Sequence, residues 1–219
     1  MGPRFVEVFG DPPNPGILGL VANHLRGGGL VAMPTETVYG FGGTLDDGPL
    51  TALQNLKGRR EEKPFLVLVP GMGAVSDLLW TAPARELARV FWPGGLTLVL
   101  ADVNGRFPPG VQSPRGTVAI RQSPHPVARG VLELLGEPII STSANPPGGS
   151  PALNAREAGE AARALGAQEE LWVLDHGPLG PSEPSTIVDC SGEQPVVLRE
   201  GAVPLGRLRC VLPEVQWPV

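Results

Sequence analysis

Four short polar segments hold the residue types that could do chemistry in this chain: Pro34–Thr37, Lys57–Phe65, Ser141–Asn145 and Pro184–Thr186. Hydroxyl and amide side chains at strand ends are suited to hydrogen-bonding a polar small molecule, which commonly binds there in open α/β sheets. The second segment contains the only two lysines, Lys57 and Lys63, among 17 basic residues. Lysine and arginine together supply the charges that a polyphosphate needs. The four segments therefore indicate a nucleotide site.

Local signatures of other chemistries are missing. The sequence has no GxxxxGK[ST] loop, no GxGxxG after a strand, no GxSxG and no HExxH. Its three histidines are far apart, so a hydrolase triad or a zinc site is disfavoured and no metal ligand is predicted. Each polar segment alone also fits a turn or a helix cap, and Lys57–Arg60 fits a solvated helix end. Only the joint order of the segments favours a site.

The composition favours a folded domain. Glycine and proline make up 56 of 219 residues (30 and 26), which raises the question of disorder. However, hydrophobic residues are 42%, charged residues 18% and the net charge is −5, unlike a disordered chain. No apolar run is long enough for a transmembrane helix, and no signal peptide is evident. We therefore expect a cytoplasmic protein with reduced Cys190 and Cys210, whose pI of about 5.2 gives no support to nucleic-acid binding.

Helical and strand patterns alternate irregularly along the chain, which predicts one α/β domain with a mixed sheet. Asn14 and Pro15 have the residue types of a helix N-cap and first helical residue, and Asn154 with Glu157 resembles a capping box. Helices are predicted at 15–26, 50–56, 84–91, 126–135 and 155–165. Strands are predicted at 6–9, 30–33, 65–69, 96–100, 117–121, 138–142, 171–174, 186–190 and 196–199.

Seven motifs follow one another along the chain: PTETVYGFG (34–42), KGRREEKPF (57–65), FWPGGLTLVL (91–100), TVAIRQSPHPVA (117–128), STSAN (141–145), PSTIVD (184–189) and LREG (198–201). In this order they resemble the YrdC/TsaC family of threonylcarbamoyl-adenylate synthases. Lys57/Arg59 and Ser143/Asn145 match its KxR and SxN signature. The resemblance covers residues 16–201. It implies a single YrdC-like domain over residues 1–219, of the short form, in which 202–219 is a tail. A twisted mixed β-sheet with flanking helices would carry a concave ligand site.

The resemblance also implies roles for individual residues. Lys57 and Arg59 would be catalytic, and replacing either with alanine is expected to abolish turnover without unfolding the chain. The residues that would bind ATP are Lys57, Arg59, Lys63, Thr117, Ser143, Asn145 and Arg199. The residues that would bind threonine are Thr35, Thr37, Tyr39, Arg121, Ser141 and Ser185. Of these, Arg121 would pair with the carboxylate, since a guanidinium binds it bidentately.

The implied reaction condenses L-threonine, bicarbonate or carbon dioxide, and ATP to threonylcarbamoyl-AMP and pyrophosphate. Magnesium is expected to bridge the phosphates, without a nameable protein ligand. A transferase complex would then move the threonylcarbamoyl group to adenosine 37 of tRNA, so tRNA and that complex are possible partners. No covalent enzyme intermediate is needed, which fits the missing nucleophile motifs.

Three positions depart from the family pattern: Arg60 replaces a usual proline, Leu68 stands where many members have a threonine-contacting histidine, and FWPGG replaces FWPGP. Two alternatives stay open, of which only the second follows from these departures. One is an RNA-binding module without turnover, binding tRNA or double-stranded RNA. The other is a drifted paralogue acting on another carbamoyl substrate. The intact STSAN and KGR motifs weigh against the second alternative.

Overall fold

The computed structural model of the chain describes residues 2–58 and 64–217. These residues form six α-helices and one short 3-10 helix, η1 (Met72–Val75). The α-helices are α1 (Pro15–Arg26), α2 (Asp47–Lys57), α3 (Ala82–Phe91), α4 (Pro126–Leu135), α5 (Ala155–Ala164) and α6 (Leu205–Val211). The strands are β1 (Arg4–Glu7), β2 (Leu30–Pro34), β3 (Tyr39–Gly43), β4 (Leu66–Leu68), β5 (Leu96–Ala101), β6 (Thr117–Arg121), β7 (Ile139–Ser143), β8 (Leu171–Asp175), β9 (Thr186–Asp189) and β10 (Val196–Arg199).

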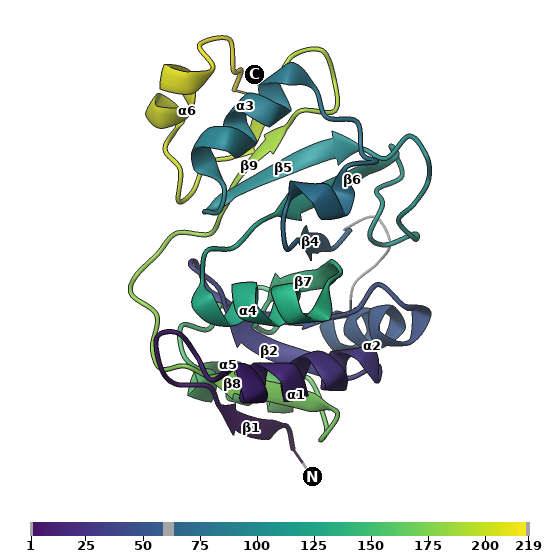
Figure 1. Ribbon diagram of the computed structural model, residues 1–219, viewed down its shortest axis with the longest axis vertical. Helices are drawn as coiled ribbons and strands as arrows, with labels where there is room; N and C mark the ends of the chain where they lie inside the picture. Colours follow the sequence, from purple (N-terminus) through teal and green to yellow (C-terminus); the bar gives the residue numbers. More distant parts are fainter. Residues whose placement is uncertain (1, 59–63, 218–219) are drawn as a thin grey trace.

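The strands join one mixed sheet in the order β1-β8-β2-β3-β7-β4-β6-β5-β9-β10 (Figure 1). The pairs β1–β8, β2–β8, β4–β6 and β5–β9 are parallel, and the remaining pairs are antiparallel. This confirms the mixed-sheet α/β fold predicted from the sequence. Because β7 lies between β3 and β4, and β8 between β1 and β2, segments far apart in the chain become neighbours in the sheet.

The two faces of the sheet are covered differently. On one face, side chains such as Ala32, Val67 and Ile140 pack with α2, α3, α5 and α6 in a core that runs from β8 to β10. On the other face, Leu68 and Ile139 pack with α1 and α4 in a smaller core. Successive residues of a strand point to opposite faces, which separates these two groups. Residues of β5, β6, β9 and β10 take no part in the smaller core, so the second face is only half covered.

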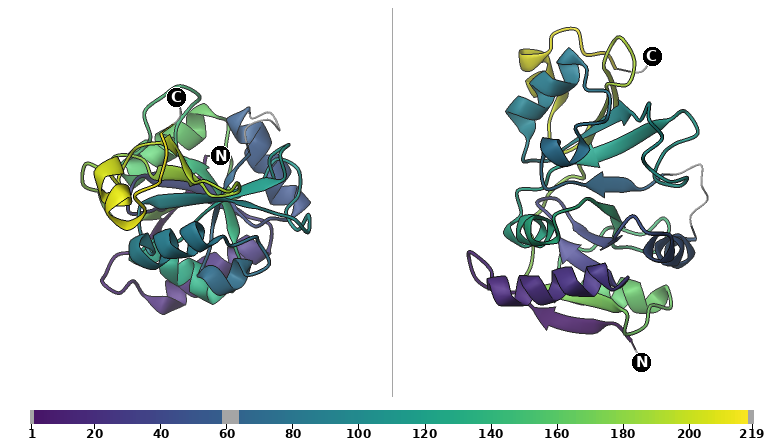
Figure 2. Two further views of the ribbon diagram at one scale, coloured as in Figure 1. Left: turned by 90° about the horizontal axis from the view of Figure 1, so that it is seen from above. Right: turned by 45° about the vertical axis from the view of Figure 1, so that its right-hand side comes forward.

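The helices are spread along the long axis of the molecule (Figures 1 and 2). Helices α1 and α4 lie side by side in the half of the molecule that holds the N-terminus, whereas α3 and α6 lie together near the C-terminus. Figure 2 shows that the long sheet connects these ends. Within the described ranges, no helix has the length and apolar character needed to cross a membrane.

The predicted helix starts are confirmed by their hydrogen bonds. Asn14 caps α1, because its side chain accepts the N–H of Gly16 at 2.8 Å. At α5 the side chain of Asn154 accepts the N–H of Glu157 at 2.9 Å, as a capping box requires. The Glu157 carboxylate, however, accepts the N–H of Leu153 instead of completing the box.

The structure differs from the predicted elements in three places. No strand was predicted between residues 34 and 64, but Tyr39–Gly43 forms the buried strand β3. The tail after residue 201 contains helix α6. The first strand lies at Arg4–Glu7, two residues before the predicted range.

Candidate functional site

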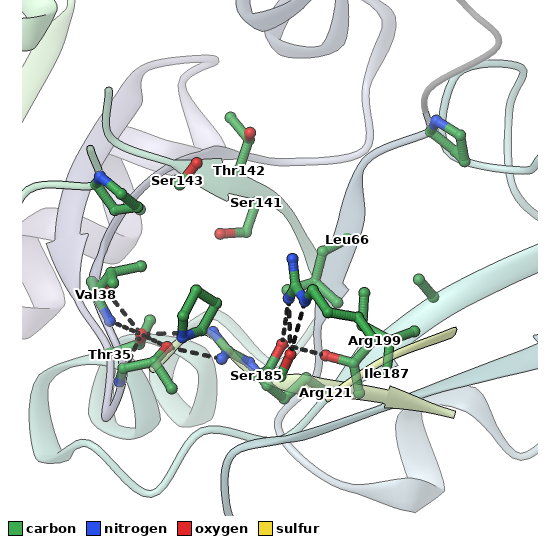
Figure 3. A pocket seen from close by; sticks show the side chains of 17 residues that line it. Thr35, Val38, Leu66, Arg121, Ser141, Thr142, Ser143, Ser185, Ile187 and Arg199 are labelled. Carbon is green, nitrogen blue, oxygen red and sulfur yellow. Dashed lines mark hydrogen bonds between the residues drawn. The ribbon is translucent and has the colours of Figure 1, made fainter. Parts of the chain in front are cut away.

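A cavity of about 280 Å³ lies on the half of the sheet that α1 and α4 leave uncovered (Figure 3). Strands β3–β7, β9 and β10 contribute to its wall, largely through alternate residues that share one face of the sheet. The lining residues are Thr35, Thr37, Val38, Gly40, Pro64, Leu66, Thr97, Ala119, Arg121, Ser141, Thr142, Ser143, Pro151, Pro184, Ser185, Ile187 and Arg199. Hydroxyl groups and two guanidiniums therefore supply most of the polar character of the wall.

Arg121 is a buried cation at the end of β6, and only 4% of it is exposed. Its Nη1 donates to Thr37 Oγ1 at 2.9 Å and lies 3.0 Å from Glu36 Oε1, while Nη2 lies 3.4 Å from Thr35 Oγ1. Burial lowers the pKa of Arg121, and the Glu36 carboxylate opposes that effect. The group stays charged, because arginine does not lose its proton in proteins. Its Nε has no partner among the described residues, which leaves a buried donor for a ligand.

The loop after β2 is fixed by its own hydroxyl groups. Thr35 Oγ1 donates to the carbonyl of Val38 at 2.7 Å and accepts the N–H groups of Thr37 and Val38, both at 3.3 Å. The hydroxyls of Thr35 and Thr37 lie 3.1 Å apart. Because the Thr35 hydrogen is used on Val38, Thr37 can donate to Thr35 while it accepts from Arg121. The hydroxyls of Thr35 and Thr37 thus have fixed orientations beside the guanidinium.

A second guanidinium, Arg199 of β10, lines the same cavity. Its Nε and Nη2 donate to the carbonyl of Ser185 at 3.1 and 2.7 Å, and Nη2 lies 3.3 Å from Ser185 Oγ. Thr97 Oγ1 holds that hydroxyl at 2.8 Å. Burial and the charge of Arg121 lower the pKa of Arg199. The two cations thus act on each other across the region where Ser185 lies (Figure 3), which favours an anion between them.

Lys57, the last residue of α2, ties that helix to the loop after β7. Its Nζ donates to the carbonyls of Ser143 and Asn145 at 2.9 and 2.5 Å and to Asn145 Oδ1 at 3.1 Å. The Ser143 hydroxyl also donates to Asn145 Oδ1, at 2.6 Å. The structure therefore brings Lys57, Ser143 and Asn145 together, as the pairing of their motifs suggested. The ammonium has three hydrogens, and these contacts can engage all of them.

Other predicted residues lie elsewhere. Thr117 shares the cavity's face of the sheet, but it bonds to Ser113 and does not line the cavity. Tyr39 points to the opposite face and packs in the large core. Its hydroxyl donates to the carbonyl of Gly177 at 3.0 Å, and burial raises its pKa to about 12. The structure thus does not bring Tyr39 into the cavity, because successive residues of β3 point to opposite faces and Gly40 is the one on the cavity's face.

The lysine motif is described only in part. Arg59, Arg60 and Lys63 lie outside the described residues, whereas Pro64 lines the cavity. Leu68 pairs in register with Arg121 but packs in the smaller core and does not line the cavity.

Sequence reasoning missed Glu36, Ser123 and Thr97. Ser123 donates to Glu36 Oε2 at 2.5 Å, so the two residues fix one side of the Arg121 site. The signal for Glu36 was its position between two predicted threonine-binding residues. The signal for Thr97 was a hydroxyl inside an apolar strand.

The described residues contain no group of three His, Cys, Asp or Glu side chains that could hold a metal ion. Glu36 is the carboxylate beside the cavity, and Arg121 and Ser123 already engage it. These residues do not fit a protein-held magnesium site.

Comparisons with known proteins agree with the motifs. A family model for Sua5, YciO and YrdC proteins, described as telomere recombination, matches residues 23–201. The chain is 34% identical over 191 residues to a Bacillus subtilis threonylcarbamoyl-AMP synthase, covering 86% of this chain and 54% of that protein. It is 35% identical over 184 residues to one from Marinobacter nauticus, covering 81% and 93%. The structure of Pyrococcus abyssi Sua5 complexed with L-threonine is similar, with a TM-score of 0.85 and 30% identity over all of this chain and 63% of that one. The chain thus spans about half to six-tenths of two longer relatives and nearly all of the third.

Proposed function

The chain belongs to the Sua5/YciO/YrdC family, and we propose that it is an L-threonylcarbamoyladenylate synthase. It would condense L-threonine, carbon dioxide or bicarbonate, and ATP to threonylcarbamoyl-AMP and pyrophosphate. The observation that carries the proposal is the buried Arg121, which lines a cavity rich in hydroxyl groups and whose Nε has no partner among the described residues. A buried donor without a partner is costly unless a ligand or water supplies the acceptor.

Threonine is the proposed occupant of the region around Arg121. A guanidinium can bind a carboxylate with two parallel hydrogen bonds. The Thr35 and Thr37 hydroxyls lie beside it, and those of Ser141 and Ser185 line the same cavity. These groups suit the hydroxyl and ammonium of a small amino acid. The volume of about 280 Å³ is near the lower end for small-molecule sites, so it fits the amino acid better than the whole nucleotide.

The proposed ATP site begins where the cavity meets the loop after β7 and strand β10. Arg199 and Ser143 line the cavity, and Asn145 lies beside Ser143. Arg199 can offer charge to the phosphates, together with Arg59 and Lys63 of the lysine motif. In this arrangement Lys57 positions the Ser143–Asn145 loop, and it can contact phosphate only by giving up one of those bonds.

In the proposed reaction, the protein positions the reactants and stabilises charge. The threonine amine attacks carbon dioxide, a nitrogen–carbon bond forms, and the amine proton leaves to solvent. A carbamate oxygen then attacks the α-phosphorus of ATP, and the bond to pyrophosphate breaks. Holding the reactants in line and offsetting charge on the leaving pyrophosphate are the expected contributions. Magnesium would enter with the phosphates of ATP, since the described residues do not fit a metal site of their own.

The product would pass to a transferase that modifies adenosine 37 of tRNA, and the proposed setting is the cytoplasm. The test is pyrophosphate release from ATP with bicarbonate and magnesium across a panel of amino acids. We expect release with L-threonine and much less with L-valine, which has a methyl group in place of the hydroxyl. Arg199→Ala should lose most activity, whereas the exposed Arg209→Ala should keep it. No threonine-dependent release from the wild-type protein would refute the proposed function.

A further inference from the structure

Glu36 lies behind Arg121 and outside the cavity wall. Its Oε1 is 3.0 Å from Arg121 Nη1, and its Oε2 accepts the Ser123 hydroxyl at 2.5 Å. The Oε1 atom is buried and receives no hydrogen bond from the described residues, although it is within ion-pair distance. The Nη1 hydrogen bond is made to Thr37 instead. Glu36 therefore acts on Arg121 through its charge, and its Oε1 accepts no hydrogen bond from the guanidinium.

The side chains of the pair are almost removed from water, with 5% of Arg121 and 17% of Glu36 exposed. A buried cation without a counter-charge is strongly destabilising, so Glu36 stabilises the site while no ligand is bound. The wall holds two cations, Arg121 and Arg199, and the Glu36 carboxylate offsets one of them. The uncompensated charge is that of Arg199, so a carboxylate that binds Arg121 shares the guanidinium with Glu36.

We infer that Glu36 is a positioning residue, the resident counter-anion that Arg121 shares with the carboxylate of its substrate. Glu36 keeps the guanidinium charged and in place before binding, and Ser123 fixes the carboxylate. After binding, the two carboxylates repel each other through the same guanidinium, so Glu36 weakens carboxylate binding and favours release. The inference rests on the proposed function for the identity of the substrate, but not for the role of Glu36.

Glu36→Gln should lower the stability of the protein and raise its affinity for a carboxylate. This variant keeps the size of the side chain and an acceptor for Ser123, but it removes the negative charge. The folded protein should melt roughly 5–10 °C lower, since a partly buried pair loses one partner. A carboxylate ligand should now bind more tightly, because it becomes the sole counter-anion. L-threonine should bind at least about tenfold more tightly to the variant than to the wild type, given the Coulomb energy of charges a few ångströms apart.

Two probes separate this inference from the proposed function. Sodium acetate, compared with sodium chloride at equal ionic strength, tests only a carboxylate on Arg121. Acetate should raise the melting temperature of Glu36→Gln clearly more than that of the wild type. L-threonine, compared with L-threoninamide, then tests the amino acid, and the gain in affinity should appear only for the compound with the carboxylate. The matched control is Ser123→Ala, which keeps the charge and should bind L-threonine within about twofold of the wild type.

These measurements test the role of Glu36 and the identity of the substrate separately. An acetate effect no larger in Glu36→Gln than in the wild type overturns the inference, and so does an equal change in Ser123→Ala. If Glu36→Gln does not fold, Glu36→Asp is the second variant, because its shorter side chain moves the negative charge away from Arg121. It should also bind L-threonine more tightly than the wild type, by a smaller factor than expected for Glu36→Gln. Unchanged or weaker binding by the aspartate variant would then overturn the inference. If acetate discriminates but L-threonine binds no variant, the role of Glu36 stands and the proposed substrate is wrong.

Discussion

Replacing Lys57 with methionine should loosen the loop after β7 and lower the stability of the fold. Methionine keeps most of the aliphatic stem, but it removes the ammonium that donates to Ser143 and Asn145. The sequence alone predicted that Lys57 could be removed with the fold intact. The structure adds a stability cost to that prediction, because Lys57 is only 8% exposed and its hydrogen bonds join α2 to the loop after β7.

The size of the effect follows from the contacts that are lost. Two backbone carbonyls, those of Ser143 and Asn145, lose their charged donor, whereas Asn145 Oδ1 keeps the hydroxyl of Ser143. An unsatisfied buried acceptor costs about 1–3 kcal/mol, and water can reach part of this loop. A net loss of about 2–4 kcal/mol is therefore expected. For a chain of 219 residues this corresponds to a melting temperature lower by roughly 4–16 °C.

Thermal unfolding followed by circular dichroism measures this change, and hydrogen exchange over residues 141–149 locates it. Arg156→Met is the matched control, since it removes an exposed ion pair with Glu160 that is worth about 0–1 kcal/mol. The control should melt within about 2 °C of the wild type. If Lys57→Met melts as the control does and residues 141–149 exchange at the wild-type rate, the ammonium does not hold this loop.

Three further changes test other parts of the site. Arg121→Lys loses the planar fork and should raise the KM for L-threonine in pyrophosphate release by about 10–100-fold; an unchanged KM would exclude bidentate binding. In Gly201→Ala the new methyl group would overlap the carbonyl of Pro184, so the melting temperature should fall, whereas Gly206→Ala meets nothing within 4 Å and should not lower it. Burial lowers the pKa of His125 from 6.5 to about 4, so the unfolded state takes up the proton first as the pH falls. The free energy of unfolding should therefore decrease from pH 6.5 to 4, and less so in His125→Asn; equal slopes in denaturant titrations would contradict this.

Most helices and strands could be predicted because their patterns are local. The caps at Asn14 and Asn154 needed only neighbouring residues, and apolar runs such as that of β5 are typical of buried strands. Strand β3 was missed because Gly40 and Gly42 suggest a turn. These glycines are needed for close packing, since a Cβ would come 3.0 Å from Ser141 Oγ at Gly40 and 3.0 Å from the carbonyl of Ile140 at Gly42. That requirement arises from β7, a hundred residues away in the chain.

The site was predictable in its residue types but not in its geometry. The motifs pointed to Arg121 and Thr35, and the structure places both in one cavity wall. Tyr39 belongs to the same motif as Thr35, yet strand alternation turns it to the other face. The role of Glu36 depends on the path of Arg121 across the sheet, which no local pattern specifies.

The cavity wall takes its first residue from position 35 and its last from position 199. Strands β9 and β10 lie at one edge of the sheet, where β9 pairs with β5. They come from residues 186–199, so they are made after the other eight strands. During synthesis, strands β1–β8 can pair with one another before Ser185 and Arg199 have been made. At that stage the sheet lacks its last two strands, and the cavity wall lacks Pro184, Ser185, Ile187 and Arg199. A truncated product lacking β10 should accordingly be inactive even if its remaining core folds.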